Sequence, residues 1–224
     1  MRPALERRAA AEFLGTLFLL ATVVGSGIMA EKLASGNVAI ALLANTLATG
    51  AGLIALILTF GPISGAHMNP AVTISDAMAG GLPWREAPVY IAAQTIGAFA
   101  GVAAAHGMFG LAIFTVSTHV RSGSSQLLSE FVATFGLLAV IWGCHRTRPS
   151  AVPFAVGAYI TAAYWFTAST SFANPAVTLA RSLSNTFAGI RPEDVVGFIA
   201  AQLAGAIAAT LVFGWLQPAA GQSE

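Results

Sequence analysis

The chain alternates between long apolar stretches and short polar breaks, a pattern that predicts several membrane-spanning helices. Three stretches contain no Asp, Glu, Lys or Arg, namely Leu33–Ser75, Ala87–Val120 and Pro149–Ala180. Each is longer than the ~20 residues with which a helix crosses the core of a bilayer. Hydropathy and chain breakers together predict six spans. They lie near Ala9–Met29, Val38–Phe60, Ala87–Met108, Leu127–Cys144, Pro153–Thr170 and Val195–Leu216.

Two apolar segments remain that are too short to span a bilayer. As helices, Asn69–Ala79 and Asn174–Leu183 would each reach ~15 Å, about half of the ~30 Å hydrocarbon layer. Each begins with Asn-Pro, and Asn favours the N-cap while Pro favours the first helical position. The sequence therefore predicts two half-helices that re-enter the membrane, with chain breaks at Pro62 and Gly65 before the first of them.

Three motifs occur twice in the same order, which indicates an internal repeat. Ala11–Thr16 matches Ser129–Thr134, Asn69–Thr73 is identical to Asn174–Thr178, and Ala92–Ala98 matches Ala200–Ala206. The repeats cover about 8–110 and about 126–217 of a single predicted transmembrane domain, 1–224. Because each repeat holds three spans, an odd number, the second must enter the membrane from the opposite side. Short paired segments in inverted repeats indicate a site near the middle of the membrane.

The composition supports a membrane protein and excludes several other classes. Of 224 residues, 56% are hydrophobic and 8% are charged, whereas a soluble domain carries about 25% charged residues. This excludes a soluble enzyme, a nucleic-acid-binding protein and a disordered tail. The net charge of +1 indicates no electrostatic partner, and the single cysteine, Cys144, excludes an intrachain disulfide and any multi-cysteine metal site. We expect no metal and no cofactor.

The basic residues favour one orientation. With a cytoplasmic N-terminus, six of them fall inside and four outside, a bias that is clearest around the first span. The inside set is Arg2, Arg7, Arg8, Arg85, Arg146 and Arg148, and the outside set is Lys32, Arg121, Arg181 and Arg191. The first apolar run is long enough to be a retained span. We expect a multi-pass protein of a bacterial inner membrane with its N-terminus in the cytoplasm.

The two Asn-Pro-Ala segments predict a constriction where the half-helices meet. Each helix N-terminus carries roughly +0.5 elementary charge from its dipole. Asn69 and Asn174 would cap these ends with their carbonyl oxygens and leave their amide N–H groups as donors. A neutral hydrogen-bond acceptor can pass such a point, whereas a cation is repelled, an arrangement described for aquaporin-type pores.

These motifs resemble those of the aquaporin (major intrinsic protein) family over about residues 8–216. The resemblance rests on Ala11–Phe13, Ser64–Thr73, the two Ala-Gln-x-x-Gly-Ala segments and Asn174–Ala176. It implies an all-α membrane protein in which six transmembrane helices and two re-entrant half-helices, in two inverted repeats, surround one pore per subunit. It also implies a homotetramer.

The resemblance further implies a selectivity filter outside the Asn pair. Counting from the two Asn residues places it at Thr49, Ala162, Ser171 and Val177. Family members ordinarily carry Arg at the last position, and Arg supplies a charge, several donors and bulk that Val lacks. With small Thr49 and Ala162, we expect a filter that admits solutes larger than water and has a weaker barrier to cations.

The substrate expectation follows from this departure. The sequence resembles a bacterial, arsenic-resistance-associated, aquaglyceroporin-like branch in which a hydrophobic residue replaces the Arg. This implies a passive channel for small uncharged solutes, chiefly arsenous and antimonous acid, with methylated arsenicals and glycerol-like solutes as further candidates. Thr178 stands where glycerol channels usually carry Asp, which counts against polyols. A water-selective aquaporin and a proton-coupled transporter stay open as alternatives, whereas no nucleophile–base pair suggests an enzyme.

Two acidic residues lie within predicted spans, where ionisable side chains are candidates for function. Glu12 and Glu130 occupy matching positions of the two repeats. Either they form a proton relay or, as we favour, each accepts backbone N–H groups of a re-entrant loop. His67 is expected to pack within the first loop, with a pH gate as the alternative. Pro70 and Pro175 are expected to support the starts of the half-helices.

Overall fold

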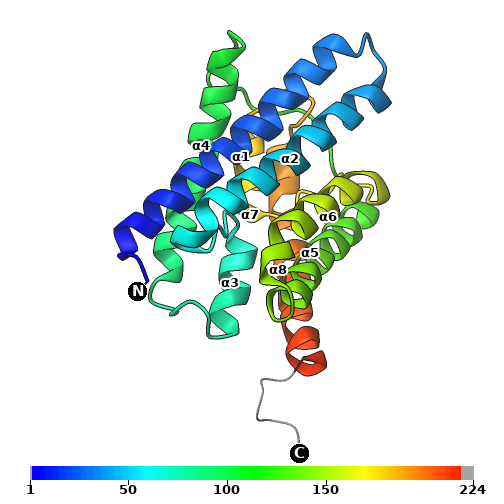
Figure 1. Cartoon of the computed structure of the whole chain (residues 1–224). Helices are drawn as coiled ribbons and strands as arrows, with labels where there is room; N and C mark the ends of the chain where they lie inside the picture. The colour runs from blue at the N-terminus through cyan, green and yellow to red at the C-terminus, as the bar shows by residue number, and fades with distance from the viewer. Residues whose placement is uncertain (1, 218–224) are drawn as a thin grey trace, which may run out of the picture.

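The structure, a computed structural model, describes residues 2–217 and consists of helices in this part of the chain (Figure 1). The six long helices and two half-helices confirm the predicted all-α fold. They are α1 (Leu5–Leu33), α2 (Val38–Ser64), α3 (Pro70–Met78), α4 (Ala87–Met108), α5 (Ser124–His145), α6 (Val152–Phe166), α7 (Pro175–Arg181) and α8 (Pro192–Leu216). A short 3-10 helix, Pro149–Ala151, precedes α6.

Helix lengths agree with a membrane protein. Within the described residues, α1, α2, α4, α5 and α8 are long and apolar enough to cross a bilayer. The 15 residues of α6 reach ~22 Å, and the 3-10 helix adds to its start. The predicted break at Pro62 is wrong, because α2 continues through it to Ser64. The helix ends one residue later at Gly65, whose φ of 93° is a left-handed conformation that glycine adopts without strain.

The two repeats pack in the same way. In the first, α1 lies against α2 and α4; in the second, α5 lies against α6 and α8. A contact between α2 and α6 joins the two halves, and α3 meets α7 in the middle. Glycine allows the closest contacts between helices in both halves. A Cβ atom at Gly97 would collide with the carbonyl oxygen of Phe13, and a Cβ atom at Gly205 would collide with the carbonyl oxygen of Phe131. The repeated Ala-Gln-x-x-Gly-Ala segment thus serves helix packing in both halves.

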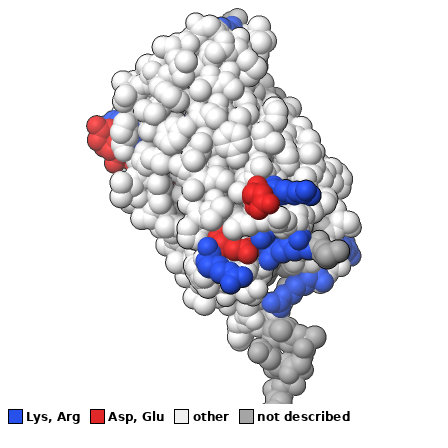
Figure 2. Space-filling model, turned by 90° about the vertical axis from the view of Figure 1, so that its left-hand side faces the viewer, with Lys and Arg blue, Asp and Glu red and all other residues white. Residues whose placement is uncertain are grey.

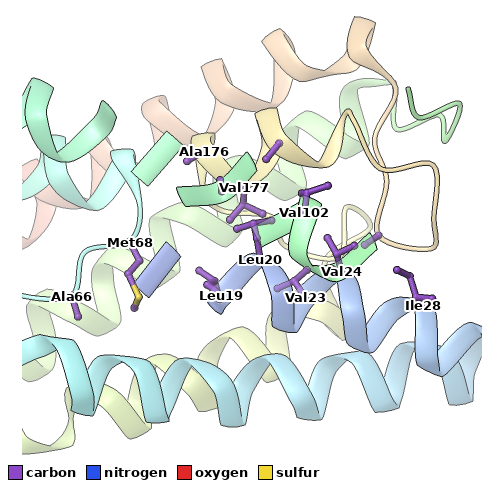
Figure 3. Packing of buried hydrophobic residues seen from close by; sticks show 14 residues of the cluster. Leu19, Leu20, Val23, Val24, Ile28, Ala66, Met68, Val102, Ala176 and Val177 are labelled. Carbon is purple, nitrogen blue, oxygen red and sulfur yellow. The ribbon is translucent and has the colours of Figure 1, made fainter. Parts of the chain in front are cut away.

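The largest apolar cluster connects α1 with both re-entrant segments. Figure 3 shows Leu19, Leu20 and Val23 of α1 packed in one cluster with Met68 and Val177. Met68 is 1% exposed and Val177 4%. The half-helices are therefore held in the centre of the bundle by side chains of a spanning helix.

The two ends of the bundle can be told apart by their loops. We call the end that holds residue 2, the loop 79–86 and the 3-10 helix the near end. The far end holds the loops 34–37, 109–123 and 182–191, the last two of which are joined by backbone hydrogen bonds. On the face in Figure 2, charged side chains gather towards the near end, below a broad uncharged surface. Large apolar side chains such as Phe18 and Trp215 are exposed on the helices, as expected for contact with lipid.

Candidate functional site

A cavity of about 510 Å³ passes between the repeats and includes residues of both re-entrant loops. Arg2, Gly81 and His145 line it at the near end. Asn69 and Asn174 line its middle, and Thr49 and Arg181 line it towards the far end. Its walls between these points are largely aliphatic and come from α1, α2, α5 and α6: Leu19, Val23, Leu53, Ile57, Leu137, Leu138, Ile141, Val152, Val156 and Ile160.

The two Asn side chains cap the half-helices and also tie the two loops together. The Oδ1 atom of Asn69 accepts from Ala71 N at 2.9 Å, and that of Asn174 accepts from Ala176 N at 3.0 Å. Each Nδ2 donates across to the other loop, Asn69 to Ala173 O at 2.7 Å and Asn174 to Met68 O at 2.8 Å. An amide nitrogen carries two hydrogens. The expectation that both stay available to a solute therefore needs correction, since the crossed bonds leave one per Asn.

The backbone of the two loops is held in an unusual conformation at matching positions. Ala66 and Ser171, three residues before each Asn, have φ of 49° and 51°. Met68 and Ala173, directly before each Asn, have φ of 48° and 47°. A left-handed conformation costs a residue other than glycine roughly 1–2 kcal/mol. Such loops persist only where surrounding groups hold them in place.

Two buried carboxylates supply much of this support. Glu12 accepts from His67 N at 2.9 Å, Met68 N at 2.6 Å and the Ser64 hydroxyl at 2.6 Å. In the second repeat, Glu130 accepts from Phe172 N at 2.8 Å and Ala173 N at 2.9 Å. Both carboxylates are fully buried, so these bonds satisfy charges that water cannot reach.

A glutamine completes each of these networks. Gln94 donates to Glu12 at 2.8 Å and to the Thr73 hydroxyl at 2.9 Å. Gln202 does the same with Glu130 at 2.6 Å and Thr178 at 2.8 Å. Through these bonds α4 and α8 are tied to the half-helices in the same geometry, which explains why the sequence repeats both the acid and the glutamine.

His67 lies on the near side of the first loop and lines the cavity. Its Nδ1 is 3.1 Å from the Thr73 hydroxyl, and its Nε2 is 3.5 Å from Oδ2 of Asp76. These contacts place the ring between the loop and α3. Pro70 and Pro175 occupy the first helical positions after their Asn caps.

The predicted filter positions do not all face the cavity. Thr49, Ser171 and Val177 line it, but Ala162 is exposed on the outer surface of α6. Tyr164 lines the cavity in its place, and its hydroxyl is 3.3 Å from that of Thr49. Two residues turn a helix by about 200°. The chain from α6 to Asn174 is thus shorter than the family spacing implies, and counting back from the Asn selected the wrong face of α6.

Sequence reasoning missed Phe172, which lines the cavity beside Ser171. Asp76 and Arg181 each lie seven residues after an Asn, a position from which the sequence offers them either as vestibule residues or as solvated helix ends. Both line the cavity, one at each end. Within residues 2–217, no three His, Cys, Asp or Glu side chains come together as a metal site.

Comparison with known proteins agrees with this architecture. The family model described as Major intrinsic protein matches residues 2–170 and 145–223. The chain is 56% identical over 216 residues to "Aquaglyceroporin AqpS" of Rhizobium meliloti, covering 96% of this chain and 92% of the relative. It is 30% identical over 208 residues to "Probable aquaporin NIP7-1" of Arabidopsis thaliana, covering 91% and 74%.

A solved structure has the same fold. The aquaglyceroporin from Plasmodium falciparum superposes with a TM-score of 0.73 at 23% identity, and the match covers 95% of both chains. The two inverted halves, the Asn pair at the middle of a continuous cavity and the family match lead to one conclusion. The chain belongs to the major intrinsic protein family and is an integral membrane channel for small solutes.

Proposed function

We propose that the pore conducts small uncharged metalloid acids, with arsenous and antimonous acid as its main solutes. The observation that carries the proposal is Val177, which lines the cavity in the first turn of α7 with an apolar, uncharged side chain. A guanidinium here would fill the pore and add fixed donors, both of which valine lacks. The 56% identity to a protein named an aquaglyceroporin supports a pore for solutes larger than water.

One observation favours a second candidate, a water-selective channel. Tyr164 places a phenol ring at the level where the sequence alone suggested a small side chain. Its hydroxyl, beside that of Thr49, supplies a donor and an acceptor together with considerable bulk. The proposed filter is therefore Thr49, Tyr164, Ser171 and Val177, of mixed size and polarity.

The deciding experiment measures both fluxes on the same vesicles. The purified protein is reconstituted into proteoliposomes, and initial arsenous acid entry and osmotic water flux are recorded beside protein-free liposomes. Fast, non-saturating arsenous acid entry without any ion gradient is the expected result. Water entry without arsenous acid entry would favour the water channel, and saturable entry that needs a proton gradient would favour a coupled transporter.

We also propose that Asn69 and Asn174 form the central constriction. Each retains one amide hydrogen beside the start of a half-helix, where the helix dipole is positive. Glu12 and Glu130 then act as supports of the loops, because their oxygens are engaged by neighbouring donors. A proton relay would therefore have no free carboxylate oxygen at Glu12 or Glu130.

We propose a homotetramer in a bacterial inner membrane, with the near end in the cytoplasm. The broad apolar surface of the long helices supports lipid and subunit contacts, and six of ten basic residues lie at the near end. Chemical cross-linking in membranes tests the tetramer, and labelling of an introduced far-end cysteine by an impermeant reagent in intact cells tests the orientation.

A further inference from the structure

The two half-helices carry opposite charges at corresponding positions. Asp76 follows Asn69 by seven residues and lies near His67, at the near end of the cavity. Arg181 follows Asn174 by the same spacing and lines the far end. The chain thus keeps the repeat but exchanges an acid for a base, which makes the far mouth of the pore positive.

Arg181 is almost completely buried, with 2% of its surface exposed. Its Nε donates to Ala188 O. Its guanidinium carbon lies 3.4 Å from the centre of the Phe172 ring, where the ring face attracts a cation. One N–H group and the plane of the guanidinium are therefore fixed by the protein, which orients the remaining donors.

The outer fork of Arg181 has no protein acceptor among residues 2–217. A guanidinium has five N–H donors, four of them on Nη1 and Nη2. Of the hydrogen bonds and ion pairs of this part of the chain, only the bond from Nε involves the Arg181 side chain. An unpaired buried charge is costly, so groups in the cavity must satisfy it. The fork matches two oxygens on one atom, as in a carboxylate or phosphate.

A second guanidinium strengthens the positive field. Arg121, from the far-end loop, lies 4.8 Å from the same Phe172 ring. Its Nε donates to Gly189 O at 2.8 Å and its Nη1 to Ser169 O at 3.0 Å. Burial lowers the pKa of Arg121 to about 10, so the side chain is still protonated at neutral pH.

The carboxylates nearby are occupied by other groups. Glu130 is engaged by the amides of the second loop and by Gln202. Asp194 accepts from the backbone N–H of Arg121 at 2.8 Å and from the Arg191 side chain at 2.9 Å. The Arg181 fork is thus available to water or to a ligand that enters from the far mouth.

We propose that Arg181 forms an oxyanion-binding site at the far mouth of the pore, one helical turn beyond Val177. The ligand class is a small oxyacid anion that presents two oxygens on one central atom. Residues four apart on a helix lie about 5–6 Å from each other, so a bound oxyanion sits directly before the apolar filter. The site belongs to the same pore as the proposed function but does not depend on which neutral solute passes through it.

Direct binding of inorganic phosphate tests the site independently of transport. The broadening of the phosphorus NMR line of phosphate is measured in titrations with the purified full chain in detergent. The native protein, Arg181→Gln and Lys32→Gln are compared. Lys32 is the matched control, because it is exposed at the same end and its replacement removes the same charge. We expect saturable binding in the native protein and in Lys32→Gln, and binding weakened about tenfold or more in Arg181→Gln. Equal binding in Arg181→Gln, or no binding by the native protein, would overturn the proposal.

Two further measurements test the site even if Arg181→Gln fails to fold. Arg181→Lys keeps the charge and removes the fork, so we expect phosphate binding between those of the native protein and the Gln variant. In native proteoliposomes, phosphate added at the far side should slow solute or water flux, and phosphate confined to the near side should not. Inhibition of equal size from both sides would contradict a site at Arg181. Failure of arsenous acid conduction would affect only the proposed function.

Discussion

Replacing the buried carboxylate of Glu130 by an amide tests how the second re-entrant loop is held. In Glu130→Gln, one oxygen becomes an NH₂ group and can no longer accept. The least costly orientation places this group against Phe172 N and keeps the acceptor for Ala173 N and Gln202. One bond to a charged group, worth about 1.5–3 kcal/mol, is lost, and the other two become neutral bonds at about 0.5–1 kcal/mol less each. The sum is a destabilisation of about 2.5–5 kcal/mol.

The effect is large enough to measure as thermal stability in detergent. For a chain of this size, 1 kcal/mol corresponds to about 2–4 °C, so we expect Tm to fall by roughly 5–20 °C. Glu12→Gln should cost at least as much, since Glu12 accepts from four donors. Glu6→Gln is the control, because Glu6 is exposed near the start of α1. A native-like Tm in Glu130→Gln together with a lost pH dependence of flux would refute the supporting role and revive the proton relay.

Three other changes test the pore and the packing around it. Val177→Arg should reduce arsenous acid entry severalfold while water flux persists, and unchanged arsenous acid entry would remove Val177 from the filter. Tyr164→Ala should raise glycerol and arsenous acid entry in the same assay. Its control, Ala162→Ser on the outer face of α6, should leave both entry rates unchanged, and the reverse pattern would restore Ala162 to the pore. Gly205→Val should lower Tm by separating α8 from α5, because its side chain meets the Phe131 carbonyl, while Gly214→Ala, which faces open space, should not.

The spanning helices could be predicted closely because lipid leaves few alternatives. A backbone without water must satisfy its own hydrogen bonds, so a long uncharged stretch becomes a helix over its whole length. The prediction Ala87–Met108 coincides with α4 for this reason. The predicted break at Pro62 was wrong, because a proline removes only one backbone hydrogen bond and a last helical turn can still follow it.

The pairing of the Asn segments could also be predicted, whereas the filter could not. Repeated motifs and an odd number of spans placed Asn69 and Asn174 at one point, and their crossed hydrogen bonds agree with that placement. The path from α6 to Asn174 runs through left-handed residues at Thr170, Ser171 and Ala173. The residue types do not predict these conformations, so the length of this path could not be read from the sequence. The spacing taken from the family therefore selected Ala162.

By itself, the sequence determined that this protein crosses a membrane in two inverted halves with a polar midpoint. These properties follow from local composition and from repeated motifs along the chain. Neither of these depends on how the helices finally pack. The tertiary structure decided which side chains face the cavity, among them Tyr164 and the unpaired fork of Arg181. The rotation of each helix about its axis depends on packing against its neighbours, and a shift of two residues turns a side chain from the pore to the lipid.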